Sequence, residues 1–293
     1  MEVRTTRFLI STFPIFHGVS KGSRSARVRS PVFSIEVSCG GGAYRCHQPT
    51  DTMARPPAPS VPTIEAGGAG HGRIPGMRSI IWDFGGTLFD TYPDLDRALC
   101  RTVFADDAPE HLLEVGRLTR VSTGHAVREL SRRFGVAEQE LRQAQADVKD
   151  AWMSEPAPLM EGACEVMHAV HTAGGLNLVA THRDRASAEQ LLQARGVHVD
   201  DMVCAPDGFP RKPDPTMHRE LLRRHGLEPE GVGAVGDRPA DAQAATGAGV
   251  RPFLLLSPGI ELRADGAEPI QSLCEILTWL GRPQQDSNLQ PTD

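Results

Sequence analysis

The sequence predicts an α/β protein, with a Rossmann-like parallel sheet core and an inserted all-helical domain. Short apolar runs alternate with helical segments through residues 77–281, and the loops between them are short. This alternation is typical of a parallel sheet covered by helices on both faces. A helical stretch of about 70 residues follows the first strand, which is too long for a crossover connection. We therefore expect that stretch to form a second, smaller domain.

The first predicted strand covers residues 79–84, an apolar run that ends at two glycines and hence in a turn. The helical stretch runs from about 93 to 152. Apolar residues at i, i+3, i+4 and i+7 then predict a helix over 163–170, which Gly174 stops. Later apolar runs predict strands, and amphipathic segments that end at glycine predict helices. Their order is strand 176–180, helix 186–195, strand 199–205, helix 215–225, strand 231–236, helix from 239, strand 253–256 and a last helix over 270–280.

Both ends of the chain differ in composition from the middle. Residues 1–76 hold nine Lys+Arg and four Asp+Glu, are rich in Ser, Gly and Pro, and show no sustained periodicity. We predict a disordered N-terminal extension there, and a disordered polar tail over 282–293. A targeting peptide, a flexible arm, or upstream sequence added by a wrongly chosen start codon would each account for the extension. The third is favoured, because Met77 lies two residues before the first strand.

Composition and charge exclude several function classes. The chain has 31 Lys+Arg against 37 Asp+Glu, a net charge of −6, which argues against a nucleic-acid partner. No apolar stretch approaches the ~20 residues of a membrane span, so no membrane partner is expected. The six cysteines are scattered without a CxxC pair, which argues against a zinc site or a disulfide framework and favours a cytoplasmic location. The oligomeric state stays open.

Polar side chains follow four of the predicted strands, where ligands bind in open α/β sheets. Asp83 follows the first strand and can attack phosphorus if a cation screens the anion. Thr181 ends the second strand, and Lys212 follows the third. Asp237 and Asp241 follow the fourth, share one helix face, and offer the hard oxygen ligands that suit Mg²⁺. Each signal alone has a structural alternative, such as a helix cap or an acid favoured by the helix dipole.

The joint order of Asp, Thr, Lys and paired Asp resembles the haloacid dehalogenase-like (HAD) hydrolase superfamily, in the branch with a helical cap after the first strand. The resemblance covers about residues 77–260. It implies a core formed by 77–91 and 160–281, and a cap over 92–159 that closes on the substrate. It also implies a Mg²⁺-dependent hydrolase, a phosphatase of a small phosphorylated metabolite, similar to phosphoglycolate phosphatases.

The same resemblance assigns roles to the residues at the strand ends. Asp83 matches the nucleophile, which is also a metal ligand in the family. Thr181 matches the hydroxyl that binds the transferring phosphoryl group, and Lys212 matches the lysine that stabilises nucleophile and phosphate. Asp237 matches the acidic residue that completes the metal site, with Asp241 in support.

One position departs from the family pattern. The second acidic residue of the first motif, the general acid/base for the leaving group, is Gly85 here, although its backbone carbonyl can still bind Mg²⁺. A positioned proton donor is worth ~10²–10⁴-fold in rate. Backbone amides near Gly86 and the side chain of His182 are expected to contact the substrate.

Four explanations for Gly85 remain. The leaving group needs no proton; another group (His182, Asp90 or a cap residue) donates it; the reaction is displacement on carbon, as in the dehalogenases; or the protein is catalytically impaired and binds a phosphorylated ligand. The intact acidic pair favours phosphate over halide. Phosphonate cleavage ranks low, because it requires a cap lysine and Lys149 lies too late in the insert.

Overall fold

The computed structural model describes residues 36–39, 42–45 and 76–281. Strands β1 (Glu36–Cys39) and β2 (Gly42–Arg45) pair antiparallel. The rest of the predicted extension, apart from Gly76, and the whole predicted tail lie outside the described residues, so disorder there stays a prediction. Within the described part, no helix is both long and apolar enough to span a membrane.

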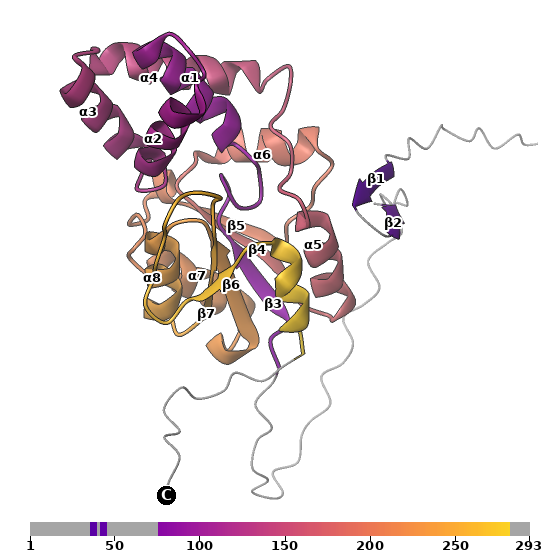
Figure 1. Cartoon of the computed structure of the whole chain (residues 1–293). Helices are drawn as coiled ribbons and strands as arrows, with labels where there is room; N and C mark the ends of the chain where they lie inside the picture. The colour runs from indigo at the N-terminus through magenta and orange to yellow at the C-terminus, as the bar shows by residue number, and fades with distance from the viewer. Residues whose placement is uncertain (1–35, 40–41, 46–75, 282–293) are drawn as a thin grey trace, which may run out of the picture. The chain divides into compact units, whose positions relative to one another are not determined.

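A six-stranded sheet forms the core of the described chain, in the order β5-β4-β3-β6-β7-β8 (Figure 1). Every neighbouring pair is parallel, which confirms the predicted fold class. The strands are β3 (Ser79–Trp82), β4 (Asn177–Thr181), β5 (Asp201–Cys204), β6 (Val232–Gly236), β7 (Arg251–Leu255) and β8 (Glu268–Ile270). Because all run parallel, their carboxyl ends meet at one edge.

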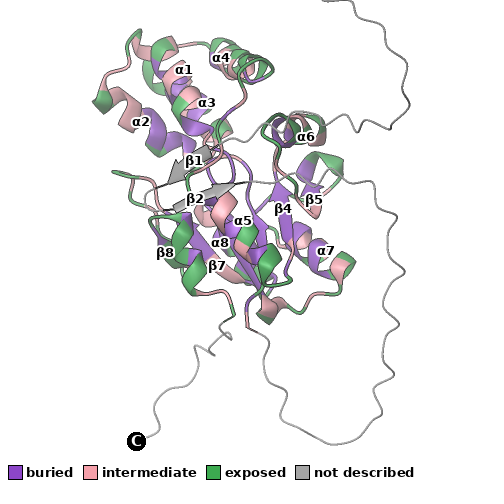
Figure 2. Ribbon diagram, turned by 90° about the vertical axis from the view of Figure 1, so that its right-hand side faces the viewer, coloured by how far each residue is buried: buried purple, intermediate pink, exposed green. Residues whose placement is uncertain are grey.

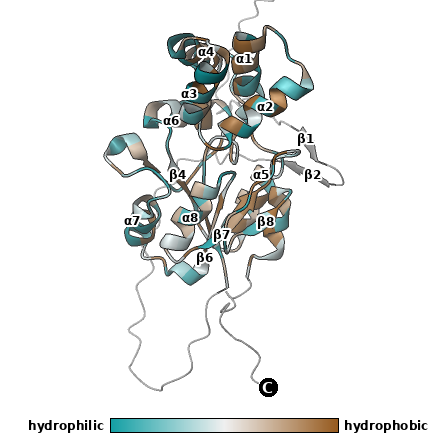
Figure 3. Cartoon of the chain, turned by 60° about the vertical axis from the view of Figure 1, so that its left-hand side comes forward, coloured by the Kyte–Doolittle hydropathy of each residue, from teal (hydrophilic) through white to brown (hydrophobic). Residues whose placement is uncertain are grey.

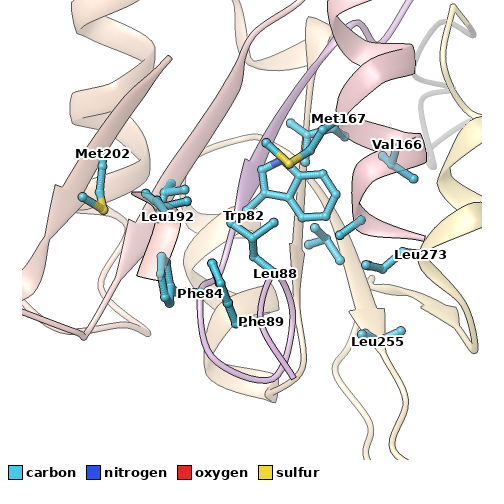
Figure 4. Packing of buried hydrophobic residues seen from close by; sticks show 14 of the residues in the cluster. Trp82, Phe84, Leu88, Phe89, Val166, Met167, Leu192, Met202, Leu255 and Leu273 are labelled. Atoms are coloured by element: carbon cyan, nitrogen blue, oxygen red, sulfur yellow. The ribbon is translucent and has the colours of Figure 1, made fainter. Parts of the chain in front are cut away.

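Two hydrophobic cores flank this sheet, because successive side chains of a strand point to opposite faces. Ile80 and Trp82 pack with α5 (Ala163–Thr172), α6 (Arg185–Ala194) and the 3-10 helix η3 (Leu273–Thr278). Figure 4 shows Trp82 beside Met167 in that core. Ile81, on the other face, packs with α7 (Thr216–His225) and α8 (Pro239–Gly247). The central strands β3, β4 and β6 are accordingly buried along their whole length (Figure 2).

The C-terminal part differs from the prediction. Residues 268–270 form β8, a sixth strand, and the helix predicted over 270–280 is wrong: only η3 forms there. Pro269 has no backbone N–H to donate to a neighbouring strand, so it fits a short edge strand. A proline also makes such a strand hard to predict from the sequence. Ser272 caps η3 by accepting the Cys274 N–H, and the Gly281 N–H donates to the Met77 carbonyl at 2.7 Å, so these two contacts bound the segment. Two further 3-10 turns are η1 (Ala205–Asp207) and η2 (Pro229–Gly231).

The predicted helical insert contains four helices: α1 (Tyr92–Phe104), α2 (Pro109–Thr119), α3 (Thr123–Phe134) and α4 (Glu138–Ala151). They carry both hydrophobic and hydrophilic residues (Figure 3) and bury an apolar cluster of their own, which includes Leu99, Val115, Leu130 and Leu141. A separate hydrophobic cluster is what an independent small domain needs. The division of the chain at 91/92 and 159/160 stays a prediction.

Candidate active site at the carboxyl end of the sheet

Three acidic side chains meet where the strands end. Asp83 follows β3 and Asp237 follows the adjacent β6, while Asp241 lies in the first turn of α8. One carboxylate oxygen from each lies within 4.8 Å of those of the other two, and all three residues are buried. Like charges held this close in a buried place repel, so the arrangement requires cations beside it.

Lys212 supplies one of these cations. Its Nζ contacts Oδ1 of Asp83, lies 2.5 Å from Oδ1 of Asp241, and donates to the Ala180 carbonyl at 3.0 Å. Burial lowers the pKa of Lys212, but Asp241 and Asp83 raise it by more, so the ammonium stays charged. Burial alone would raise the pKa of Asp241, yet Lys212 and Arg238 bring it down to about 2.

Hydrogen bonds hold both oxygens of Asp237. Thr87 Oγ1 donates to Oδ1 at 3.1 Å, and the Tyr92 hydroxyl donates to Oδ2 at 2.7 Å. Burial, with Asp241 and Asp83 nearby, raises the pKa of Asp237 to about 6. Gly86 has φ +89°, and a Cβ there would lie 2.1 Å from the Tyr92 ring, so only glycine fits. The guanidinium of Arg120, at the end of α2, stacks 3.5 Å above the same ring.

Thr181 and His182 lie at the end of β4. Thr181 is buried, and its Oγ1 accepts the Arg183 N–H at 3.0 Å, which leaves its own proton available to a ligand. His182 Nε2 accepts the Lys212 N–H at 2.8 Å and so holds the lysine-bearing loop. Burial, and then the charge of Lys212, lower the pKa of His182 to about 3.

Gly85 and Asp90 follow Asp83 in the loop between β3 and α1. A Cβ at Gly85 would lie 3.0 Å from Thr91 Oγ1, a tight contact, so the threonine hydroxyl would have to shift slightly to admit a side chain at 85. Asp90 is half-buried; burial raises its pKa, Arg120 opposes this, and Asp94 adds to it.

The structure thus brings together Asp83, Lys212, Asp237 and Asp241, four of the residues that the sequence singles out. The roles assigned to them, and to Thr181, His182, Gly85 and Gly86, stay predictions.

The sequence pattern predicts no site role for Arg183, Tyr92 or Arg238. Arg183 lies between the rings of Phe84 and Trp152, with centroid distances of 5.4 and 5.2 Å. Arg238 lies beside Asp83 and Asp241. The one available signal was position, since Arg183 and Arg238 each come two residues after a strand end.

A buried histidine near this site predicts acid sensitivity. His218 is 3% exposed, its Nδ1 has no hydrogen-bond partner, and burial followed by the charge of Lys212 lowers its pKa to about 3. Between that value and its unfolded pKa of ~6.5, the unfolded chain binds a proton that the folded chain does not. The stability is therefore complete above ~6.5 and is lost as pH falls toward 3.

We expect His218→Leu to remove about 2 kcal/mol of the stability difference between pH 7 and about pH 5. Urea unfolding at both values measures it, with the exposed His168→Gln as control. An unchanged difference in the Leu variant would show that His218 is already protonated in the folded protein.

Comparison with known proteins places the chain in a family. The haloacid dehalogenase-like hydrolase family matches residues 80–255. A phosphoglycolate phosphatase of Rhodospirillum rubrum is 31% identical over 229 residues, covering 71% of this chain and 92% of that protein. A phosphoglycolate phosphatase of Vibrio cholerae is 28% identical over 206 residues, with 66% of this chain and 88% of that protein covered.

Solved structures agree with the fold. CbbY from Rhodobacter sphaeroides, in complex with phosphate, is 25% identical with a TM-score of 0.51, covering 68% of this chain and 96% of that chain. A HAD family hydrolase from Deinococcus radiodurans, with bound phosphate and sodium, has a TM-score of 0.57 at 18% identity, covering 71% and 99%. The family match spans more than half of the chain and includes both Asp83 and Asp237. The chain belongs to the haloacid dehalogenase-like hydrolases.

Proposed function

We propose that the protein is a Mg²⁺-dependent phosphatase of a small phosphorylated metabolite, with 2-phosphoglycolate as the first substrate to test. The observation that carries the proposal is the contact of Lys212 Nζ with both Asp83 and Asp241 inside a group of three buried carboxylates. The names of the curated relatives support the substrate class.

In this proposal Asp83 is the nucleophile. Lys212 contacts Oδ1, so we assign bond formation to Oδ2. Oδ2 bonds to phosphorus as the bond from phosphorus to the ester oxygen breaks, and that oxygen takes a proton and leaves as an alcohol. Water then attacks phosphorus, the bond to Oδ2 breaks, and inorganic phosphate leaves. The Thr181 hydroxyl donates to a phosphoryl oxygen, stabilising the charge that develops there.

The proton for the leaving group comes from Asp90 or from solvent in this scheme. His182 is an unsuitable acid, because its pKa of about 3 keeps it neutral and its Nε2 already accepts the Lys212 N–H. Asp90 is half-buried, and burial raises the pKa of its carboxyl, which is the direction that a proton donor needs.

The donor set fits Mg²⁺, which prefers carboxylate oxygens and keeps waters and substrate phosphate in its shell. Asp83 and Asp237 would hold the ion, with Asp241 in support and the Gly85 carbonyl as a further candidate. Bound there, the ion would neutralise negative charge on the phosphoryl oxygens.

We expect Mg²⁺ to stabilise the folded protein. The ion relieves repulsion among buried carboxylates, and a ligand at 100 times its Kd adds about 2.7 kcal/mol to the free energy of unfolding. Thermal unfolding with Mg²⁺ and with a chelator measures this. Asp237→Asn should lose the response, whereas the exposed Asp147→Asn should keep it. Equal melting temperatures with and without Mg²⁺ in the unaltered protein would refute the site.

A carboxylate restored at position 85 should raise the rate. Because Thr91 Oγ1 crowds that position, the variant to make is Gly85→Asp with Thr91→Ala, and Thr91→Ala alone is its control. We expect about a 10²-fold gain in kcat for phosphate release, the low end of what a positioned acid supplies. A double variant no faster than the control would show that a substitute donor already operates.

Gly85 also favours a second candidate, a catalytically impaired HAD protein that binds a phosphorylated ligand. Phosphate release from 2-phosphoglycolate, sugar phosphates and acyl phosphates separates the two. Turnover supports the phosphatase. Mg²⁺-dependent binding of the same compounds without turnover supports the binding protein.

A further inference from the structure

Arg238 lies against the proposed nucleophile. It is the residue before α8, and its backbone N–H donates to Oδ2 of Asp241 at 3.0 Å. Its guanidinium Nη2 lies 3.7 Å from Oδ2 of Asp83, and its Nε lies 3.6 Å from Oδ2 of Asp241. Only 14% of the side chain is exposed. A fixed positive charge therefore faces the oxygen of Asp83 that we assign to attack.

Lys212 holds two carboxylates of the site. Its Nζ donates to Asp83 and to the Ala180 carbonyl, and Oδ1 of Asp241 lies 2.5 Å away without a hydrogen-bond partner. Most of the hydrogen-bonding capacity of the ammonium is therefore directed at the protein.

In contrast, the Arg238 guanidinium is held only by long contacts. Its two ion-pair contacts are longer than a hydrogen bond, and its buried Nε has no hydrogen-bond partner. A guanidinium carries five N–H donors in a planar fork, and burying them without acceptors is costly. Among the described residues, Lys212 and Arg238 are the cations in ion-pair contact with Asp83. The guanidinium whose Nη2 faces Asp83 therefore also carries a buried Nε donor without a partner.

We propose that Arg238 is a catalytic residue that binds the transferring phosphoryl group, donating from its guanidinium to the phosphoryl oxygens beside Asp83 Oδ2. The proposal deepens the proposed function and rests on it. A planar fork matches a tetrahedral oxyanion through two parallel hydrogen bonds, which a lysine cannot reproduce. The positive charge of Arg238 also weakens binding of a divalent cation at this site, because it already neutralises part of the negative charge of the three carboxylates.

Binding of inorganic phosphate tests this directly. Isothermal titration of the full chain, with chelator and separately with Mg²⁺, compares the unaltered protein with Arg238→Met and Arg238→Lys. Arg251→Met is the matched control: its Nη2 is also buried without a partner, but it lies at the start of β7, away from the strand ends.

We expect Arg238→Met to weaken phosphate binding at least about tenfold and Arg238→Lys about threefold, with Arg251→Met unchanged. Titration with Mg²⁺ alone should show equal or tighter binding in Arg238→Met, an opposite change that general damage to the site would not produce. Phosphate affinity within twofold of the unaltered protein in both Arg238 variants would overturn the proposal. So would an equal loss in Arg251→Met.

If circular dichroism shows that Arg238→Met is unfolded, Arg238→Lys decides, by the same loss or retention of phosphate affinity. The outcome is separable from the proposed function. Lack of turnover by the unaltered protein would refute the phosphatase, whereas the phosphate titrations would still decide the role of Arg238.

Discussion

Asp83→Asn abolishes phosphate release, by at least about 10³-fold in kcat, if the proposed chemistry is right. The amide keeps the size of the carboxylate but offers no negative oxygen to form a bond to phosphorus. The surrounding contacts with Lys212 and the backbone remain geometrically possible, so folding should survive. The measurement is phosphate release from 2-phosphoglycolate, with the exposed Asp147→Asn as control.

A second readout separates the nucleophile from a purely structural role. Acid-quenched protein should carry a phosphoryl adduct on the peptide that contains Asp83, visible by mass, and the Asn variant should not. Phosphate release by Asp83→Asn at a rate close to that of the unaltered protein would rule out attack by this residue.

Lys212→Ala should be the most destabilising single change at the site. It leaves Asp83 and Asp241 buried without their shared cation, and removing one partner of a buried ion pair costs about 3–5 kcal/mol. Activity should fall as well, because repulsion between carboxylates and phosphate is no longer screened. The exposed Lys149→Ala is the matched control.

The loss of stability in Lys212→Ala should depend on pH. Without Lys212 the folded-state pKa values of both carboxyls rise, so the folded chain retains protons that the unfolded chain has lost. The contribution of these two carboxyls to stability is then greatest at low pH and declines as pH rises through those raised values. Chemical unfolding at pH 5 and pH 8 should therefore show a larger deficit for Lys212→Ala at pH 8. A deficit that is the same at both pH values would mean that Lys212 does not neutralise these carboxylates.

The parallel strand pattern was enough to predict which polar side chains at the strand ends lie near one another. Asp83, Thr181 and Asp237 each end or follow a strand, and parallel strands end together, so their proximity follows from topology. Lys212 was harder, because it depends on a loop. Lysine is rare in this chain, which otherwise uses arginine, and that sets position 212 apart.

Other parts of the site could not be predicted from the sequence. An arginine at a helix start is ordinarily solvated, so the burial of Arg238 depends on side-chain packing that no periodicity encodes. Tyr92 reaches Asp237 only because Gly86 leaves room for its ring. The edge strand β8 was missed because it has three residues and a proline.

The hydrogen bond from Tyr92 to Asp237 joins the first turn of α1 to the residue that follows β6. The Arg120 guanidinium stacks on the same ring, and its Nε donates to Ser257 Oγ at 3.2 Å. A swing of the insert that carried α1 outward would break this hydrogen bond and let water reach Asp237, whose pKa is raised first of all by burial. The contact through Tyr92 thus couples the position of the insert to the solvation of this carboxyl.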